Sequence, residues 1–496
     1  SQGMIIVLFG IALAALVCYS LFINRIKGLP PGPPPLPLLG NFLQFRPDMD
    51  KVFVNWKRQY GRVFTVWMPH PTVILSDHEL LQEHIVRSDD KFADRINPKM
   101  LMKYRSGGEY GLVFNDNSIW RDQRRFALHT LRDVGFNSVT MQNTAVNYAQ
   151  EIVARWKLQG ANRQPVDLTM GIMIGVSNII WQQTFGRTLP YDDPLIERAK
   201  DLSNELVVRM SHPMMLAVEI FPVLRHFDRL LGSPIQQYIA CNGRLHEVIH
   251  EELELIRAEF NEDDETRSYA NAFIREMKKR ETRGEERDAF TEQQLVAACY
   301  DIWIAGFETT VNTLRFILHY MINNPEVQRK AQAEIDEKVG KRNVRMNDQK
   351  SLHYCNAIIQ EVQRMANIVT LNLTRMVSSP VTIEGYTVPA GTGIIPEFSM
   401  VHMDEREFPR PDHFCPERHI NERGEFVRDA RITPFSVGKR ACLGEGLARM
   451  ELFLYFTSFI QHLTFSSVTK VPPALNLLIS FTRSPAPYEV LIESRD

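Results

Sequence analysis

The feature that most restricts how this chain folds is a single cysteine placed in a glycine-rich loop directly ahead of a helical pattern. Residues 434–450 read PFSVGKRACLGEGLARM. Apolar residues recur at helical spacing from Leu443 to Leu454, so Cys442 stands where a helix begins. The dipole and the free N–H groups of a helix start favour a thiolate. A thiolate held out to a metal is therefore one interpretation, and a small cysteine buried in a turn is the other.

The residues around Cys442 suit a flat ligand that carries acidic groups. Gly438 and Gly444 allow the backbone to turn sharply and to approach a planar ligand closely. Arg440 is suited to pair with a carboxylate, and Phe435 is suited to cover one side of the sulfur. These residue types together match what a haem iron needs on its proximal face.

The pattern Phe435-x-x-Gly438-x-Arg440-x-Cys442-x-Gly444 resembles, in full, the haem-binding signature of the cytochrome P-450 family. The resemblance extends over essentially the whole chain and is to the microsomal, animal-type haem-thiolate monooxygenases. It implies a mainly α (α+β) fold, with a large helical region and small β-sheets. It also implies haem b (iron protoporphyrin IX) as the cofactor, with Cys442 as the metal ligand.

Two further segments carry the same resemblance away from the cysteine. The stretch Glu361-Val-Gln-Arg364 resembles the family's Glu-x-x-Arg helix, and a later Pro-Glu-Arg ends at Arg418, which completes a Glu–Arg–Arg cluster. The resemblance implies a structural role for this cluster. Two positions depart from the family pattern: His419 replaces a usual Phe or Trp, and Thr370 replaces a common Pro.

Residues 305–310, AGFETT, resemble the long helix that crosses the distal face of the haem. The resemblance implies that Glu308 and Thr309 are catalytic and deliver protons to bound oxygen, while Ala305 and Gly306 leave room for that oxygen. Taken alone, a threonine inside a helix more often donates its hydroxyl to the carbonyl four residues earlier. Both interpretations of Thr309 stay open at this point.

Haem carries two carboxylates, so arginines are expected near it. Trp120-x-x-x-Arg124 resembles the helix whose basic residue pairs with a haem propionate, and Arg440 and Arg375 are further candidates. A surface salt bridge is the alternative for each arginine. The expected cofactor-binding residues are Trp120, Arg124, Ala305, Arg375, Phe435, Gly438, Arg440 and Gly444. A basic patch for an acidic electron donor is expected from Lys439, Arg121, Arg125 and Arg132.

The N-terminal part of the chain predicts a membrane anchor. Residues 4–23 hold no charged side chain. A stretch of this length is about long enough to span a bilayer as a helix. Basic residues follow this stretch and favour a cytoplasmic location for the rest of the chain. A cleaved signal peptide is the alternative. We expect an anchor at 1–28, a stiff Pro-rich hinge at 29–41 and a catalytic domain at 42–496. We also expect a single-pass protein of the endoplasmic reticulum membrane, with its catalytic domain on the cytoplasmic side.

Local patterns predict where strands and helices lie. A hairpin is expected at 62–68 and 71–76, since both segments are rich in β-branched and aromatic residues. Helices dominate from about 78 to 365, short strands and turns return at 379–398, and a last helix is expected near 444–462.

Composition excludes some classes of partner and of fold. A formal net charge of −2 gives no electrostatic case for nucleic acid. The six cysteines include no Cys-x-x-Cys pair, so neither a disulfide framework nor a multi-cysteine zinc site is indicated.

The sequence therefore predicts a monooxygenase that inserts one oxygen atom from O2 into an apolar substrate, a fatty acid, another lipid or a xenobiotic. Its electrons would come from NADPH through NADPH–cytochrome P-450 reductase, with cytochrome b5 as a further partner and the bilayer as the substrate reservoir. A haem-thiolate peroxide isomerase or dehydratase is one alternative. The other is a membrane-anchored zinc metalloprotease, because His246-Glu247-x-x-His250 places two histidines on one helical face.

Overall fold

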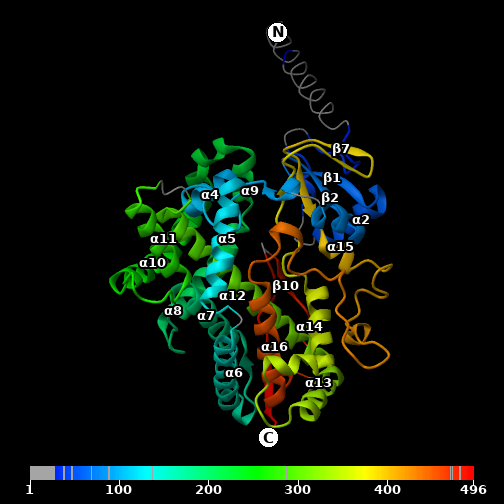
Figure 1. Ribbon diagram of the computed structural model, residues 1–496. Coiled ribbons are helices and arrows are strands. Elements are labelled where there is room, and N and C mark those ends of the chain that lie inside the picture. The colour runs from blue at the N-terminus through cyan, green and yellow to red at the C-terminus, as the bar shows by residue number, and fades with distance from the viewer. Residues whose placement is uncertain are drawn as a thin grey trace. The chain divides into compact units, whose positions relative to one another are not determined.

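The computed structural model describes Gly10 and residues 28–36, 39–45, 49–68, 70–87, 90–136, 138–285, 289–469, 471, 473–479 and 482–495. The chain divides into two compact units, and some of their elements are labelled in Figure 1. The first holds the described residues up to Ile96 together with 371–401 and 437–440, and the second holds 97–370, 402–436 and the chain from 441 onwards.

The first unit is built on a five-stranded sheet with the order β1-β2-β8-β5-β3. The predicted hairpin is confirmed, since β1 and β2 pair antiparallel, whereas β2 and β8 run parallel. The strands of this unit are β1 Val63–Met68, β2 His70–Leu75, β3 Asp94–Arg95, β5 Arg375–Met376, β6 Val381–Ile383, β7 Tyr386–Val388 and β8 Gly393–Pro396. Its helices are α2 Met49–Tyr60, α3 His78–Leu80, the π-helix Leu81–Val86 and, up to Val401, α15 Phe398–His402.

The Pro-rich segment is fixed along strand β1 of this unit. The backbone N–H of Thr65 donates to the carbonyl of Pro31 at 2.9 Å, and the Thr65 hydroxyl donates to the carbonyl of Pro30 at 2.8 Å. Gly32 is required there, because a Cβ atom would collide with the Thr65 carbonyl oxygen. The described part of the predicted hinge is therefore held on the sheet.

The second unit is mainly helical and carries most of the core. Its helices are α4 Lys99–Ser106, α5 Asn117–Asp133, α6 Val139–Gln159, α7 Thr169–Phe185, α8 Pro194–Met210, α9 Pro213–Ile220, α10 Pro234–Ala258, α11 Tyr269–Thr282, α12 Glu292–Asn323, α13 Pro325–Lys338, α14 His353–Ala366 and α16 Glu445–His462. Its strands are β4 Val166–Asp167, β9 Leu463–Ser467, β10 Leu477–Ile479, β11 Arg483–Pro485 and β12 Glu489–Ser494. The predicted helix near 444–462 is confirmed by α16.

Helix α12 runs through the middle of this unit and packs against α7, α10, α14 and α16 (Figure 1). Its 32 residues begin at a regular N-cap, where the Thr291 hydroxyl accepts the backbone N–H of Gln294. Most of its side chains are buried, as expected of a helix that is covered on several sides. Trp303 of α12 meets Trp181 of α7 edge to face, with ring centroids 5.1 Å apart.

Among the described residues, no helix is both long enough and apolar enough to cross a membrane. The predicted span at 4–23 lies outside the described residues, apart from Gly10.

Candidate active site

Cys442 lies in a short loop that ends where α16 begins. Its backbone N–H donates to the carbonyl of Phe435 at 2.8 Å, and Gly444 is the N-cap of the helix. The side chain is exposed, yet the surrounding protein raises the pKa of the thiol by burial, and this outweighs the lowering by the Gly444 N–H and by Arg124. The N–H at the helix start therefore favours the thiolate, as predicted, but burial opposes it more strongly. A metal ion that binds Cys442 has to displace the thiol proton.

Helix α5 brings Arg124 to the same loop. Its Nη2 donates to the carbonyl of Ala441 at 2.6 Å, and its guanidinium carbon lies 5.9 Å from the ring centroid of Trp120. Burial lowers the pKa of Arg124, and Cys442 acts in the opposite sense. The structure thus joins Arg124 to the backbone next to Cys442 and places Trp120 against Arg124.

A residue that the sequence analysis missed covers Phe435. The guanidinium carbon of Arg449 lies 4.7 Å from the Phe435 ring centroid, a cation–π contact. Arg449 is held by Glu445 of the same helix through a 2.8 Å bond from Nε. The four-residue spacing of this Glu and Arg after the glycine loop is the sequence signal that would have found the pair.

Three further predicted residues lie in the first unit. Gly438 has φ +72°, and a Cβ there would collide with the carbonyl of Ile85, so the glycine is required. Arg440 donates from Nε to the carbonyl of Ala93, and Arg375 donates from Nη2 to the carbonyl of Val437 at 2.6 Å. Both arginines are buried, which excludes a surface salt bridge as their role.

Helix α12 has an exposed position at Ala305. This residue is exposed although Trp303 and Phe307 on either side are buried. Thr309 donates its hydroxyl to the Ala305 carbonyl at 2.9 Å, so the ordinary helical interpretation of this threonine is confirmed. The hydroxyl oxygen keeps its lone pairs for a second hydrogen bond.

Gly306 lies where helix α12 packs against α7. A Cβ at this position would lie 2.8 Å from Cδ1 of Ile180, so the glycine allows α12 to pack closely against α7. That Gly306 also leaves room for oxygen stays a prediction, and of the two residues Ala305 is the exposed one.

Glu308 has a partner that the sequence analysis missed. Its Oε1 accepts the hydroxyl of Thr482, which immediately precedes β11. Burial raises the pKa of Glu308, and the bond from Thr482 only partly offsets this. The carboxyl group is thereby biased towards the neutral acid.

The predicted Glu–Arg–Arg cluster is present and has a fourth member. The Glu361 carboxylate accepts hydrogen bonds from Nη2 of Arg364 at 2.8 Å and from Nε of Arg418 at 2.9 Å. His419, the departure from the family pattern, donates from Nε2 to the same carboxylate at 2.8 Å. Burial opposes ionisation, but the bonds from Arg364 and His419 lower the pKa of Glu361 to about 2.

The two-histidine motif of α10 does not form a metal site. Burial lowers the pKa of His246 to about 4, and its ring lies edge to face with Tyr300 at 5.5 Å. His250 is exposed. Within the described ranges, no group of three or more His, Cys, Asp or Glu side chains is arranged to hold a metal ion.

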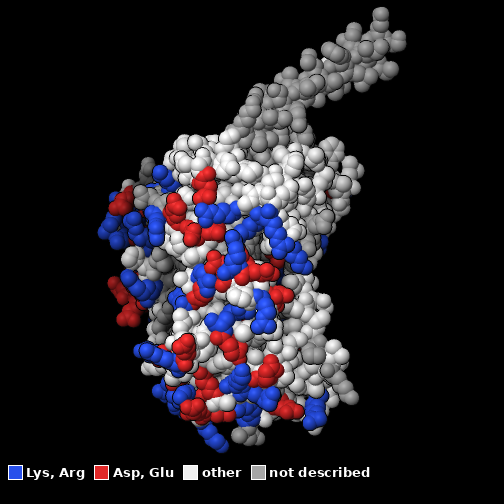
Figure 2. Space-filling model, turned by 90° about the vertical axis from the view of Figure 1, so that its right-hand side faces the viewer, with Lys and Arg blue, Asp and Glu red and all other residues white. Residues whose placement is uncertain are grey.

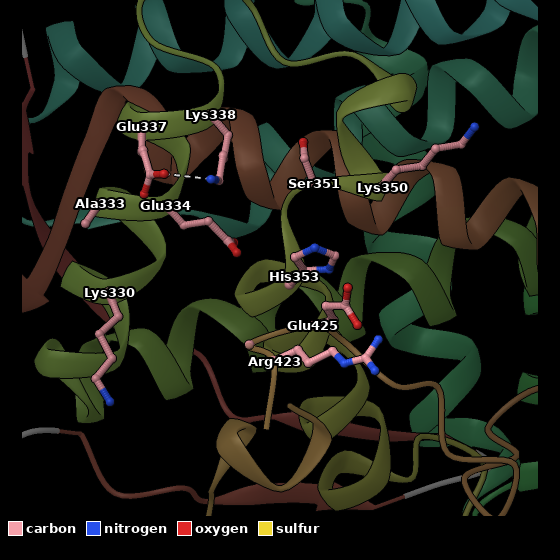
Figure 3. A pocket seen from close by; sticks show the side chains of 11 residues that line it. Lys330, Ala333, Glu334, Glu337, Lys338, Lys350, Ser351, His353, Arg423 and Glu425 are labelled. Atoms are coloured by element: carbon pink, nitrogen blue, oxygen red, sulfur yellow. Dashed lines mark hydrogen bonds and ion pairs between the residues drawn. The ribbon is translucent and has the colours of Figure 1, made fainter. Parts of the chain in front are cut away.

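A pocket of about 730 Å³ lies elsewhere in the second unit, at the surface (Figure 3). It is lined by Lys330, Ala333, Glu334, Glu337, Lys338, Lys350, Ser351, His353, Arg423, Gly424 and Glu425. Figure 3 shows charged side chains of both signs around it, with Lys338 paired to Glu337. None of these residues belongs to the predicted site, and a solvent-facing rim of this kind does not suit an apolar ligand.

Comparison with known proteins gives one consistent result. The chain matches the family model described as Cytochrome P450 over residues 30–492. It is 36% identical over 477 residues to "Probable cytochrome P450 CYP36A1" of Caenorhabditis elegans, which covers 96% of each chain. It is 33% identical over 484 residues to cytochrome P450 2J5 of Mus musculus, covering 96% of this chain and 94% of the relative. It is 34% identical over 468 residues to cytochrome P450 2D6 of Homo sapiens, covering 93% and 92%.

Proposed function

Because the chain belongs to the cytochrome P450 family and is a P450 monooxygenase, we propose that it inserts one oxygen atom from O2 into an apolar substrate. The observation that carries the proposal is the exposed Cys442 side chain in a loop tied down by hydrogen bonds from Cys442 N–H to Phe435 and from Arg124 to Ala441. A fixed, accessible sulfur is suited to hold a metal.

The residues around Cys442 are of the types that would hold a haem group. When bound, haem supplies the oxygen activation that a thiolate ligand favours. We propose that Arg124 and Trp120 bind or orient this group beside the Cys442 loop, and that Ala305 leaves space over it. Further residues are proposed on the resemblance to the family signature: Phe435, Gly444, Arg375, Gly438 and Arg440.

We propose that Thr309 and Glu308 move protons on the α12 side. Thr309 is positioned by its bond to the Ala305 carbonyl, which leaves its oxygen able to accept a hydrogen bond from water. Glu308 has a raised pKa and therefore keeps a proton that it can donate, while Thr482 orients one of its oxygens. The two residues are adjacent in sequence but are held by different partners.

We propose NADPH, delivered through NADPH–cytochrome P-450 reductase, as the source of electrons, with cytochrome b5 as a further partner. Helix α5 presents exposed Arg121, Arg125 and Arg132 next to the arginine that contacts the Cys442 loop, and basic residues suit an acidic donor protein. On the face shown in Figure 2, positive and negative side chains are interspersed.

The membrane location remains a proposal from the sequence. The uncharged stretch 4–23 supports an anchor at 1–28, and the Pro-rich segment 29–41, held on strand β1 where it is described, supports a stiff connection to the catalytic domain at 42–496. We propose the endoplasmic reticulum membrane, with the catalytic domain on the cytoplasmic side. An apolar substrate would then be drawn from the bilayer.

The test is reconstitution of the full chain with haem, a microsomal reductase and NADPH, with a polyunsaturated fatty acid as the probe. Mass spectrometry should find products one oxygen atom heavier that depend on NADPH and on the reductase. A product formed from a fatty-acid hydroperoxide without NADPH, and none with NADPH and O2, would instead support the peroxide isomerase alternative.

A further inference from the structure

Helix α16 carries a line of polar side chains through the core of the second unit. Glu451, Tyr455, Ser458 and His462 follow one another at spacings of four, three and four residues, which places them on one face of the helix. The first three are fully buried. Their carboxyl and hydroxyl oxygens have no hydrogen-bond partner among the residues that the structure describes.

The upper end of this line lies at helix α12. Burial raises the pKa of Glu451 well above its ordinary value, so the group is held as the neutral acid. The nearby Thr310 hydroxyl lowers the pKa of Glu451, although the two groups do not meet the geometry of a hydrogen bond. Thr310 immediately follows Thr309, so the acid adjoins the segment of α12 that carries the proposed proton-moving residues.

The middle of the line is given room by a glycine of α7. A Cβ at Gly175 would lie 2.9 Å from the Tyr455 hydroxyl oxygen, so any other residue would crowd the phenol. Burial raises the pKa of Tyr455 well above its ordinary value, so the phenol stays protonated. The phenol can accept one hydrogen bond and donate another.

The lower end of the line reaches solvent. His462 is the last residue of α16 and is half-buried, with Nε2 3.3 Å from Nε2 of Gln150. Burial lowers its pKa, and so do Lys157 of α6 and Arg495 near the chain end. The imidazole is thus mainly neutral near pH 7 and can accept a proton from water and release it again.

We propose that these four side chains form a proton path from the protein surface at His462 to Thr310, with Glu451 as its internal proton store. The path rests on the proposed monooxygenase function, which consumes protons. Neighbouring side chains on one helical face lie about 5–6 Å apart at their Cβ atoms. Ordered water is therefore needed between them, and buried unpartnered polar groups are where such water binds.

The transfer balances in protons and moves no electrons. The O–H bond of the Glu451 carboxyl breaks as its proton passes to the Thr310 oxygen. The hydroxyl proton of Thr310 passes at the same time to an ordered water molecule beside α12, which is the acceptor. Each hydroxyl along the line then accepts one proton and donates one. A proton from bulk water enters at His462, so Glu451 returns to the neutral acid.

The protonation state of Glu451 is tested without substrate. Infrared difference spectra between the purified enzyme and E451Q at neutral pH should show the carbonyl band of a protonated carboxyl group that the variant lacks. Because Glu308 is also biased towards the acid, E308Q serves as the control and should remove a different band. If E451Q loses no protonated-carboxyl band, Glu451 is ionised and the proposal is wrong.

The transfer itself is tested by how NADPH electrons divide between product and hydrogen peroxide. The amide in E451Q keeps the shape but has no acidic proton to release. Product per NADPH should fall about tenfold, which is less than the roughly 10²–10⁴-fold effect of a direct general acid, because Glu451 acts through Thr310. E451D should recover most of this loss. A purely structural Glu451 predicts the reverse order, with E451Q close to the parent enzyme and E451D impaired, and that order would overturn the proposal.

The line has a matched control on the same helix. S458A should lower product per NADPH, whereas T457V should not, because the buried Thr457 hydroxyl already donates to the Phe453 carbonyl at 2.6 Å and lies on another face. Equal effects of the two variants would contradict a path along this face. Failure of the parent enzyme to oxygenate any probe would concern the proposed function, since the infrared measurement uses no substrate.

Discussion

The imidazole of His419 donates a hydrogen bond from Nε2 to Oε2 of Glu361 at 2.8 Å, and both side chains are buried. The position where the family pattern has an aromatic ring therefore holds a polar residue that has joined the neighbouring ion-pair cluster. A buried carboxylate needs such donors, because an uncompensated charge in the interior is strongly unfavourable.

Replacement of His419 by Phe should lower the free energy of unfolding by about 1–3 kcal/mol, the cost of leaving a buried acceptor without one of its donors. Denaturation in urea measures this change from the shift in midpoint. H419Q is the control, since its side-chain amide also has an N–H to donate and should recover part of the loss. Equal stability of H419F and the parent protein would show that the hydrogen bonds from Arg364 and Arg418 are sufficient for the Glu361 carboxylate.

The pKa of Glu361, lowered to about 2 from an ordinary 4.5, makes stability depend on acid. A group whose pKa is lower in the folded state contributes stability that is present above the unfolded value and is lost as pH falls through the folded value. The difference in unfolding free energy between the parent protein and E361Q should be about 3–5 kcal/mol near pH 7. It should shrink as pH falls from 4.5 towards 2.

A surface ion pair provides the comparison for Glu361. Arg62 and Glu384 meet at 2.9 Å, with both side chains more than a third exposed. E384Q should change the unfolding free energy by less than about 1 kcal/mol, as is usual for solvent-exposed pairs. A loss as large as that of E361Q would mean that burial does not determine the contribution of these carboxylates.

A second buried carboxylate holds the loop after α4. Asp301 of α12 pairs with Arg105 and accepts the backbone N–H groups of Leu112 at 2.6 Å and Val113 at 2.9 Å. D301N keeps the shape but leaves the Arg105 charge buried without its partner, so unfolding free energy should fall by about 3–5 kcal/mol. Hydrogen exchange should also become faster at the Leu112 and Val113 amides. Unchanged exchange at these two amides would contradict a role of Asp301 in holding the loop.

Local patterns were sufficient to predict elements whose signal lies within a few residues. The hairpin of β1 and β2 and helix α16 follow from alternation and from helical periodicity, both of which are short-range. The partner of Glu308 could not be predicted in this way, because Thr482 is 174 positions away in the chain. The position of Gly306 against Ile180 likewise depends on how α12 packs on α7, which no single segment encodes.

The packing of Gly306 gives a prediction with an internal control. Alanine in a helix interior is about 1 kcal/mol more favourable than glycine where space is free. A Cβ atom added at Gly243 of α10 would meet no other atom within 4 Å, so G243A should raise the unfolding free energy by that amount. At Gly306 the added methyl group would lie 2.8 Å from Ile180, so G306A should gain nothing or lose stability. A gain equal to that of G243A would show that α7 moves aside freely.

Cys442 gives the prediction that bears most directly on the proposed function. The hydrogen bond that the structure records from this residue to Phe435 uses its backbone N–H, so Cys442→Ser should leave the fold and the loop intact while it removes the sulfur. The red-shifted Soret band of the reduced carbonyl complex should then disappear, because that band depends on a thiolate ligand to the iron. C415S is the matched control, since Cys415 is a half-buried thiol whose backbone N–H donates to Glu361, and its loss should leave the band unchanged. If the band persists in C442S, another residue holds the iron; if it disappears in C415S as well, the loss reflects general damage to the fold.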